Sequence, residues 1–255
     1  VATGSAVFTD FMRELGARDL HFGLLSGIPM IMLSVQFLGA WLANRVRSRK
    51  RLFITLAIAG RLLYLPIACL PLLLPGVSHD TLIRLLIGLV AVSAAISNMI
   101  GPPWFSWMAD LIPRQVLSRF WGQRQRYMHI TLTLSQLGLV LFALFSSWPA
   151  TLIFPVIMAV AVPAAIVDIL LFFAVHEPPN TVIQGRPLAE TILAPLRNPD
   201  YRSFIVFSCA WNAAAMFSAA FMQVYVLKGL GRSLAETAFI WCFLGVGVAL
   251  SSGLW

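Results

Sequence analysis

The sequence predicts an all-α polytopic membrane protein, because long apolar segments alternate with short connectors that hold most of the cations. Hydrophobic residues make up 59% of the 255 residues and charged residues only 11%, whereas a soluble domain carries about 25% charged residues. Several apolar runs reach the roughly 20 residues that a helix needs to cross a hydrocarbon core. They lack the alternating polarity of membrane β-strands.

The connector 44–51 sets the orientation of the predicted helices. It places five cations within eight residues, between the apolar ranges 21–43 and 52–75. Each charge would cost several kcal/mol inside the hydrocarbon core, so this connector is expected in water. By the positive-inside rule the basic loops are expected in the cytoplasm, and the predicted location is the cell (inner) membrane.

The other segments follow from the same pattern. Residues 1–11 are too short to cross and are expected to be the end of a truncated first helix. Crossings are expected at 21–43, 52–75, 81–103, 127–145, 150–176, 201–227 and 234–255. Gly23 and Gly27 offer a surface for close helix approach, and Pro102 and Pro103 are expected to kink or end the crossing that contains them.

Three parts are expected along the chain. Residues 1–176 form an N-terminal six-helix bundle, 177–200 a cytoplasmic linker, and 201–255 the first two helices of a C-terminal bundle. In the linker Leu188, Ile192 and Leu196 lie four residues apart, which predicts a short amphipathic helix on the membrane surface. Secondary transporters are often built from two six-helix halves, so the second half is expected to continue past Trp255.

The distribution of the remaining cations supports this topology. Of the 18 Lys and Arg residues, twelve fall in connectors assigned to the cytoplasm and four in connectors assigned to the outside, while Arg61 and Arg84 lie within predicted helices. Such a bias is the orientation signal of a membrane protein. The net charge of +8 therefore comes from connectors that set the orientation in the membrane, and no nucleic-acid partner is predicted.

Two connectors resemble motifs of the major facilitator superfamily. Residues 40–49 read AWLANRVRSR, similar to the G-x-x-x-D-R-x-G-R-R motif between helices 2 and 3 of that family; Arg45 and Arg49 match, and Asn44 stands in place of the Asp. Residues 107–113, WMADLIP, and 119–124, RFWGQR, are similar to the family's loop between helices 4 and 5.

The resemblance implies a major-facilitator-type bundle, of which this sequence would hold about eight membrane helices, the first one incomplete. In the family the motif Asp helps to latch the two halves together on the cytoplasmic side. Asn44, Arg45 and Arg49 are therefore the predicted gating-loop motif, in which Asn44 keeps a hydrogen-bonding group without the charge. The antiporter motif g-x-x-x-G-P is absent, since Leu139 follows Gly138, and no subfamily is assigned.

Ionisable residues inside apolar helices are costly and are therefore candidates for function. Arg61 lies ten residues beyond Arg51, and Asp168 eight residues before His176. At 1.5 Å per residue both are expected about 12–15 Å from the cytoplasmic side. Their similar depth predicts an ion pair, which either holds the first bundle together, the favoured interpretation, or takes part in proton coupling.

The candidate solute-binding residues are Asn212, Trp211, Arg84, Asp10 and Gln136. Trp211 and Asn212 fall near mid-depth, where transporter sites lie, although packing and an interhelical hydrogen bond are alternatives. The resemblance places helices 1, 4 and 7 on the central cavity. Arg84 and Asp10 are therefore expected either to contact an anionic or protonatable solute or to snorkel to the outer headgroups.

The favoured hypothesis is a secondary active transporter that moves a small solute by alternating access, with coupling to an ion or proton left open. The alternative is a non-transporting membrane sensor or scaffold with the same fold. A membrane-embedded enzyme is disfavoured because no H-E-x-x-H or G-x-S-x-G motif occurs. The sequence predicts no catalytic residue, metal site or cofactor; the expected partners are a small-molecule solute, a coupling ion and the lipid bilayer.

Overall fold

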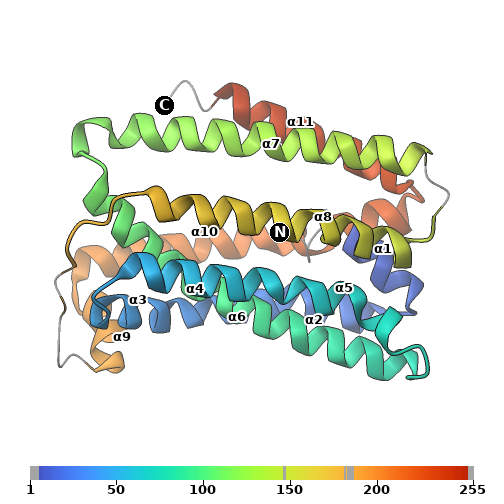
Figure 1. Ribbon diagram of the computed structural model, residues 1–255, viewed down its shortest axis with the longest axis horizontal. Helices are drawn as coiled ribbons and strands as arrows, with labels where there is room; N and C mark the ends of the chain where they lie inside the picture. The colour runs from blue at the N-terminus through green and yellow to red at the C-terminus, as the bar shows by residue number, and fades with distance from the viewer. Residues whose placement is uncertain (1–5, 146–147, 181, 183–186, 252–255) are drawn as a thin grey trace.

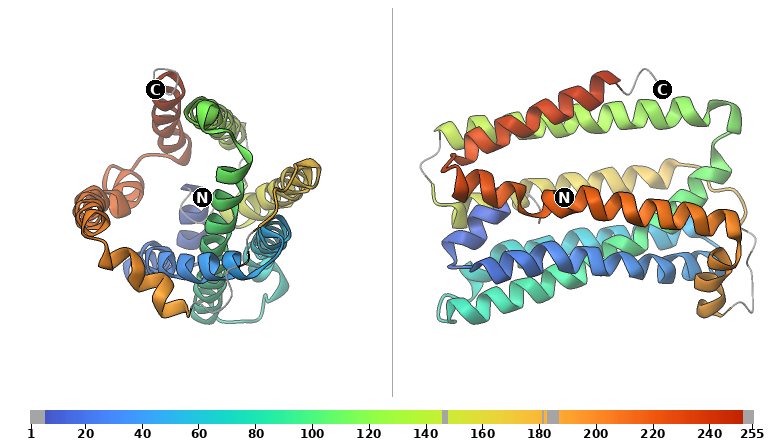
Figure 2. Two further views of the ribbon diagram at one scale, coloured as in Figure 1. Left: turned by 90° about the vertical axis from the view of Figure 1, so that its left-hand side faces the viewer. Right: turned by 180° about the vertical axis from the view of Figure 1, so that it is seen from behind.

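The computed structural model describes residues 6–145, 148–180, 182 and 187–251, and this part of the chain is helical with no strand. The long helices run parallel or antiparallel to one another along the long axis of the molecule (Figure 1). Seen along that axis, they are arranged around α1 rather than in a single layer (Figure 2). The predicted all-α class is confirmed for the described residues.

The predicted segments coincide with helices. In chain order these are α1 (Ala6–Glu14), α2 (Asp19–Ile31), α3 (Gln36–Arg45), α4 (Arg49–Leu62), α5 (Tyr64–Leu73), α6 (His79–Leu111), α7 (Leu117–Phe145), α8 (Ala150–Leu171), α9 (Leu188–Arg197), α10 (Pro199–Val224) and α11 (Leu234–Ser251). Short helical turns extend or link them: η2 (Met32–Val35), η3 (Arg114–Val116), η4 (Phe172–Ala174) and the π-helical η5 (Tyr225–Gly229). The amphipathic helix predicted in the linker is α9.

Four helices of the described part are long and apolar enough to cross a membrane. They are Asp19–Arg45, Arg49–Leu73, His79–Leu111 and Ala150–Ala174. Many large apolar side chains on these helices are exposed, among them Ile31, Leu73 and Val160, as expected of a surface that faces lipid. These features are compatible with an integral membrane protein; crossings by α7, α10 and α11 stay predictions.

The predicted crossing at 81–103 is longer than expected. α6 does not end at Pro102 and Pro103 but continues to Leu111, and Ile112 then takes an extended conformation before Pro113. A residue that precedes proline is biased away from the helical region, which explains the stop. Proline within a membrane helix is tolerated where neighbouring groups satisfy the freed carbonyls.

The connectors gather at two opposite ends of the bundle. One end, here called the basic end, holds the α3–α4 and α6–α7 connectors together with α9 (Figure 1). The α1–α2 and α5–α6 connectors lie at the other end (Figure 1), where Nδ1 of His79 lies 3.1 Å from the carbonyl oxygen of Leu15. The two motif-bearing connectors therefore face the same side, and its assignment to the cytoplasm stays a prediction.

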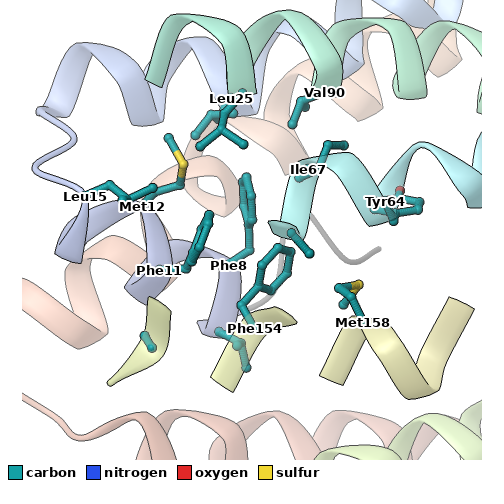
Figure 3. Close-up of a cluster of buried hydrophobic side chains, with 14 of the residues drawn as sticks. Phe8, Phe11, Met12, Leu15, Leu25, Tyr64, Ile67, Val90, Phe154 and Met158 are labelled. Atoms are coloured by element: carbon teal, nitrogen blue, oxygen red, sulfur yellow. The ribbon is translucent and has the colours of Figure 1, made fainter. Parts of the chain in front are cut away.

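Two clusters of buried apolar side chains join α1, α2, α4, α5, α6 and α8. The larger cluster lies toward the end opposite the basic one, where side chains of α1, α2, α5, α6 and α8 point toward one another (Figure 3). Its aromatic centre is formed by Phe8 and Phe11, whose ring centroids lie 5.3 and 4.8 Å from that of Phe154. The smaller cluster lies toward the basic end and surrounds Trp107, which is fully buried.

A glycine allows a close approach of two helices, but it is not one of the pair that the sequence suggested. A Cβ at Gly39 of α3 would lie 2.5 Å from the carbonyl oxygen of Met99 in α6, whereas a Cβ at Gly23 or Gly27 would have no neighbour within 4 Å. The prediction for Gly23 and Gly27 is therefore wrong. A small-residue spacing does not say which face of a helix meets a partner.

We expect Gly39→Ala to lower the free energy of unfolding by about 1–3 kcal/mol, because the added methyl group must push apart two backbones. The matched control is Gly27→Ala, where alanine meets empty space and should leave stability unchanged or raise it through helix propensity by up to about 1 kcal/mol. Unfolding of the detergent-solubilised protein by increasing sodium dodecyl sulfate measures both. Equal stabilities for the two variants would contradict this packing.

Candidate functional site

The first turn of α4 lies in a polar network at the basic end. Ser48 is the N-cap residue of α4, and its hydroxyl accepts from the backbone N–H of Arg51 at 3.1 Å. The same hydroxyl donates to Oε2 of Glu177 at 2.7 Å, and the backbone N–H of Lys50 donates to Oε1 at 2.9 Å. A carboxylate at a helix N-terminus binds otherwise unpaired N–H groups and complements the helix dipole.

Lys50 makes the complementary contact with the end of α8. Its Nζ donates to the carbonyl oxygens of Phe173 and Val175, each at 2.7 Å. A cation at a helix C-terminus pairs with the last free carbonyls. The start of α4 is thus capped by Glu177, which follows α8, and the end of α8 is capped by Lys50 from α4.

Arg49 connects α4 to α6 from a buried position. The residue is only 3% exposed, and its Nη1 lies 2.6 Å from Oδ2 of Asp110. Nη1 also donates to the hydroxyl and carbonyl oxygens of Ser106, at 2.7 and 3.1 Å. Its Nε and Nη2 are buried with no acceptor among the described residues. A buried charge without a partner is costly. The Asp110 carboxylate supplies the countercharge that allows the Arg49 guanidinium to be buried.

Residues that follow α8 complete the network. The side-chain amide of Asn180 donates to the carbonyl oxygens of Ala43 and Val46, at 3.0 and 2.8 Å, and so caps the end of α3. The indole N–H of Trp107 donates to the carbonyl oxygen of His176 at 3.1 Å. The basic-end network, as we call it, therefore joins α3, α4, α6 and α8. Its members are Ser48, Arg49, Lys50, Ser106, Trp107, Asp110, Glu177 and Asn180.

Only one residue of the predicted gating-loop motif belongs to this network. Arg49 is its buried member, whereas Asn44 is exposed and the guanidinium of Arg45 stacks on the Trp41 ring of its own helix, 4.0 Å from the centroid. The network contacts lie between α3, α4, α6 and the residues that follow α8. Sequence reasoning missed Glu177 and Asn180; the only signal was their position at the first polar residues after an apolar crossing.

The predicted ion pair between Arg61 and Asp168 is not formed. Both side chains are exposed, and no ion pair or hydrogen bond involves either of them within the described residues. α4 and α8 do pack against each other, so the depth argument placed the residues on neighbouring helices. It could not give their direction, because each residue along a helix turns the side chain by about 100°.

Asp10 and Arg84 also have separate partners. Asp10 pairs with Arg13 one turn along α1, and Arg84 pairs with Asp80 one turn along α6, each with a shortest N–O distance of 2.6 Å. Both pairs lie toward the end opposite the basic one. For both residues, contact with a solute and snorkelling to the outer headgroups stay predictions.

The polar candidates near mid-depth are not brought together by a direct contact. On α10 Asn212 donates its amide to the carbonyl oxygen of Ser208 at 2.8 Å, and Trp211 stacks with Phe207 at 6.4 Å; both candidates are exposed. Gln136 is half-buried on α7. The amide oxygen of Asn212 accepts from no group in the described part of the chain, and a role for it in solute binding stays a prediction.

The comparisons with known proteins add no relative. No family model matches the chain, and neither a curated protein nor a solved structure is significantly similar to it. Within the described residues there is also no group of three or more His, Cys, Asp or Glu side chains placed to hold a metal ion. The resemblance to the major facilitator superfamily thus rests on the motif residues alone.

We expect Asp110→Asn to lower the free energy of unfolding by about 2 kcal/mol, because Arg49 would lose its countercharge in a buried position. The value is below that for a fully buried pair, since Asp110 itself is 55% exposed. Sodium dodecyl sulfate unfolding in detergent measures the loss.

Asp80→Asn is the matched control for this substitution. Its pair with Arg84 has the same 2.6 Å separation, but the side chains are 57% and 75% exposed. Surface pairs contribute about 0–1 kcal/mol, so the control should lose less than half as much stability. A control as destabilised as Asp110→Asn would show that burial of Arg49 has no energetic role.

Proposed function

We propose that the chain is part of a secondary active transporter of the major facilitator type, which moves a small polar solute by alternating access. The observation that carries this proposal is the Arg49–Asp110 ion pair. It joins the two stretches, 40–49 and 107–113, that resemble the family's two cytoplasmic motifs. Arg49 and Asp110 are 61 positions apart in sequence and meet at the basic end. The resemblance expects both motifs on one side of the membrane.

The network supports the rigid half that alternating access requires. In transporters of this kind one bundle rocks against the other as a nearly rigid body around a central site. The basic-end network ties together the ends of α3, α4, α6 and α8, and the aromatic cluster around Phe154 fixes α1 to α8 at the opposite end. The four helices that are long and apolar enough to cross a membrane would therefore move together.

The second part of the chain contacts this body along one side. α11 packs along α7 and also contacts α1, whereas α10 packs against α9 and η5 (Figures 1 and 2). Motion of α10 and α11 relative to α2–α6 would therefore disturb few interior contacts. Asn212 on α10 and Gln136 on α7 lie on helices outside the body held by the network, and their amides suit a solute with hydroxyl, amide or carboxylate groups.

The test is uptake by the full-length protein in proteoliposomes, with a panel of labelled sugars, amino acids and organic acids, with and without a proton gradient. We expect one solute class to accumulate. Asn212→Ala and Gln136→Ala should reduce its uptake about tenfold, the loss of about 1.4 kcal/mol of solute interaction.

Gln115→Ala is the control, because Gln115 is exposed at the basic end, far from mid-depth; its uptake should equal that of the wild type. Thermal stabilisation by a solute without accumulation of any would contradict transport and support a sensor. Equal uptake in all three variants would remove Asn212 and Gln136 from the solute site.

A further inference from the structure

Four aromatic side chains form a cluster where α6 meets α7 at the basic end. Trp104 and Phe105 come from α6, and Phe120 and Trp121 come from the start of α7. The Trp121 ring lies 5.5 Å from Trp104, 5.6 Å from Phe105 and 5.6 Å from Phe120, measured between centroids. Trp104 is nearly buried, whereas Phe105 is 57% exposed. One side of the cluster is therefore fixed in the protein, and the other faces outward.

Arg124 lies over two of these rings. Its guanidinium carbon is 4.6 Å from the Trp104 centroid and 5.5 Å from that of Trp121. A cation over an aromatic face is attracted by the ring quadrupole, and this contact leaves the N–H donors of the guanidinium free for acceptors. No acceptor for these groups exists among the described residues, although the side chain is half-buried. Such donors are open to an acceptor such as a phosphate oxygen.

The lengths of α6 and α7 place the cluster at the edge of a bilayer. With 33 and 29 residues they are about 50 and 44 Å long, against a hydrocarbon core of about 30 Å. Trp104 lies seven residues before the end of α6, and Arg124 seven residues after the start of α7; both are thus about 10 Å from their helix ends. A centred helix extends beyond the core by about this distance, so the cluster lies where lipid phosphates begin.

We propose that Arg124, held by Trp104 and Trp121, binds the phosphate of a phospholipid headgroup at the basic end. The inference rests on the membrane embedding of the proposed transporter. The guanidinium donors match a phosphate oxygen pair, and the exposed Phe105 ring lies against the acyl chain. Arg119 and Arg126 are exposed on the same helix, which favours a lipid with net negative charge. A free phosphate ion shares the headgroup chemistry but gains nothing from Phe105.

The experiment titrates the purified full-length protein in detergent with phosphatidylglycerol, phosphatidylcholine or inorganic phosphate. Retention of bound lipid in native mass spectrometry gives an apparent dissociation constant. We expect phosphatidylglycerol to bind most tightly and Arg124→Gln to weaken it about tenfold, equivalent to about 1.4 kcal/mol. Trp121→Leu should weaken it similarly, because the guanidinium loses its platform.

Arg119→Gln is the matched control, because it removes the same charge from the same helix. Arg119 lies about one and a half turns from Arg124, is exposed, and has no aromatic contact among the described residues. Its binding should weaken no more than about twofold. Equal losses in Arg119→Gln and Arg124→Gln would overturn the site in favour of diffuse attraction between charges. If inorganic phosphate displaced phosphatidylglycerol at equal concentration, the ligand of Arg124 would be a phosphate ion and not a lipid, which would overturn the proposal.

Arg124→Lys keeps the charge but loses the planar guanidinium and its paired donors, and it should behave like Arg124→Gln. Wild-type affinity in this variant would overturn the role of the planar guanidinium. The readout requires no transported solute. Lipid binding without uptake would therefore count against the proposed transport alone, and uptake with unchanged lipid binding in Arg124→Gln would count against this site alone.

Discussion

A guanidinium buried at the end of a helix bundle needs a countercharge, and this requirement determines how the basic end is built. Arg49 begins α4 and is nearly inaccessible, so Asp110 must reach it from the end of α6. That contact fixes the axial position of α4 relative to α6. Glu177 and Lys50 then fix α8 relative to α4 by capping each other's helices. Each further contact depends on the alignment that the Arg49–Asp110 pair imposes.

Each end of the bundle combines an apolar cluster with polar contacts to helix termini. At the basic end the network of hydrogen bonds and ion pairs lies beside the apolar cluster around Trp107. The opposite end combines an aromatic cluster with one polar cap, in which the Glu14 carboxylate accepts from the N–H groups of Ala150 and Thr151 at 2.8 Å each.

The positions of the helices along the chain could be predicted from the sequence, because a crossing is recognised by one-dimensional features: apolar length, charged connectors and turn residues. The stretch at 44–51 identified the α3–α4 connector for this reason. The direction of each side chain could not be predicted. Arg61 and Asp168 have similar depths but do not meet, and Gly39, rather than Gly23 or Gly27, makes the close approach. Rotation about the helix axis is decided by packing between segments far apart in sequence.

The candidate site was only partly predictable for the same reason. Arg49 stood out because it matches a motif and follows a turn, but its burial depends on how α6 crosses α4. Glu177 and Asn180 are ordinary polar residues in sequence, and their role exists only because α8 ends beside α3 and α4. Trp104 and Trp107 are typical of an interfacial aromatic belt, yet packing against neighbouring helices buries them.

The measurement that tests the central claim most directly is labelling of single cysteines in the full-length protein in intact cells. Arg47→Cys, Gln115→Cys and Gly76→Cys, placed in a chain whose native cysteines are replaced, would be exposed to a membrane-impermeant maleimide. Our account predicts that Gly76→Cys reacts from outside, while Arg47→Cys and Gln115→Cys react only after permeabilisation. Reaction of Arg47→Cys and Gln115→Cys from opposite sides of the membrane would contradict it.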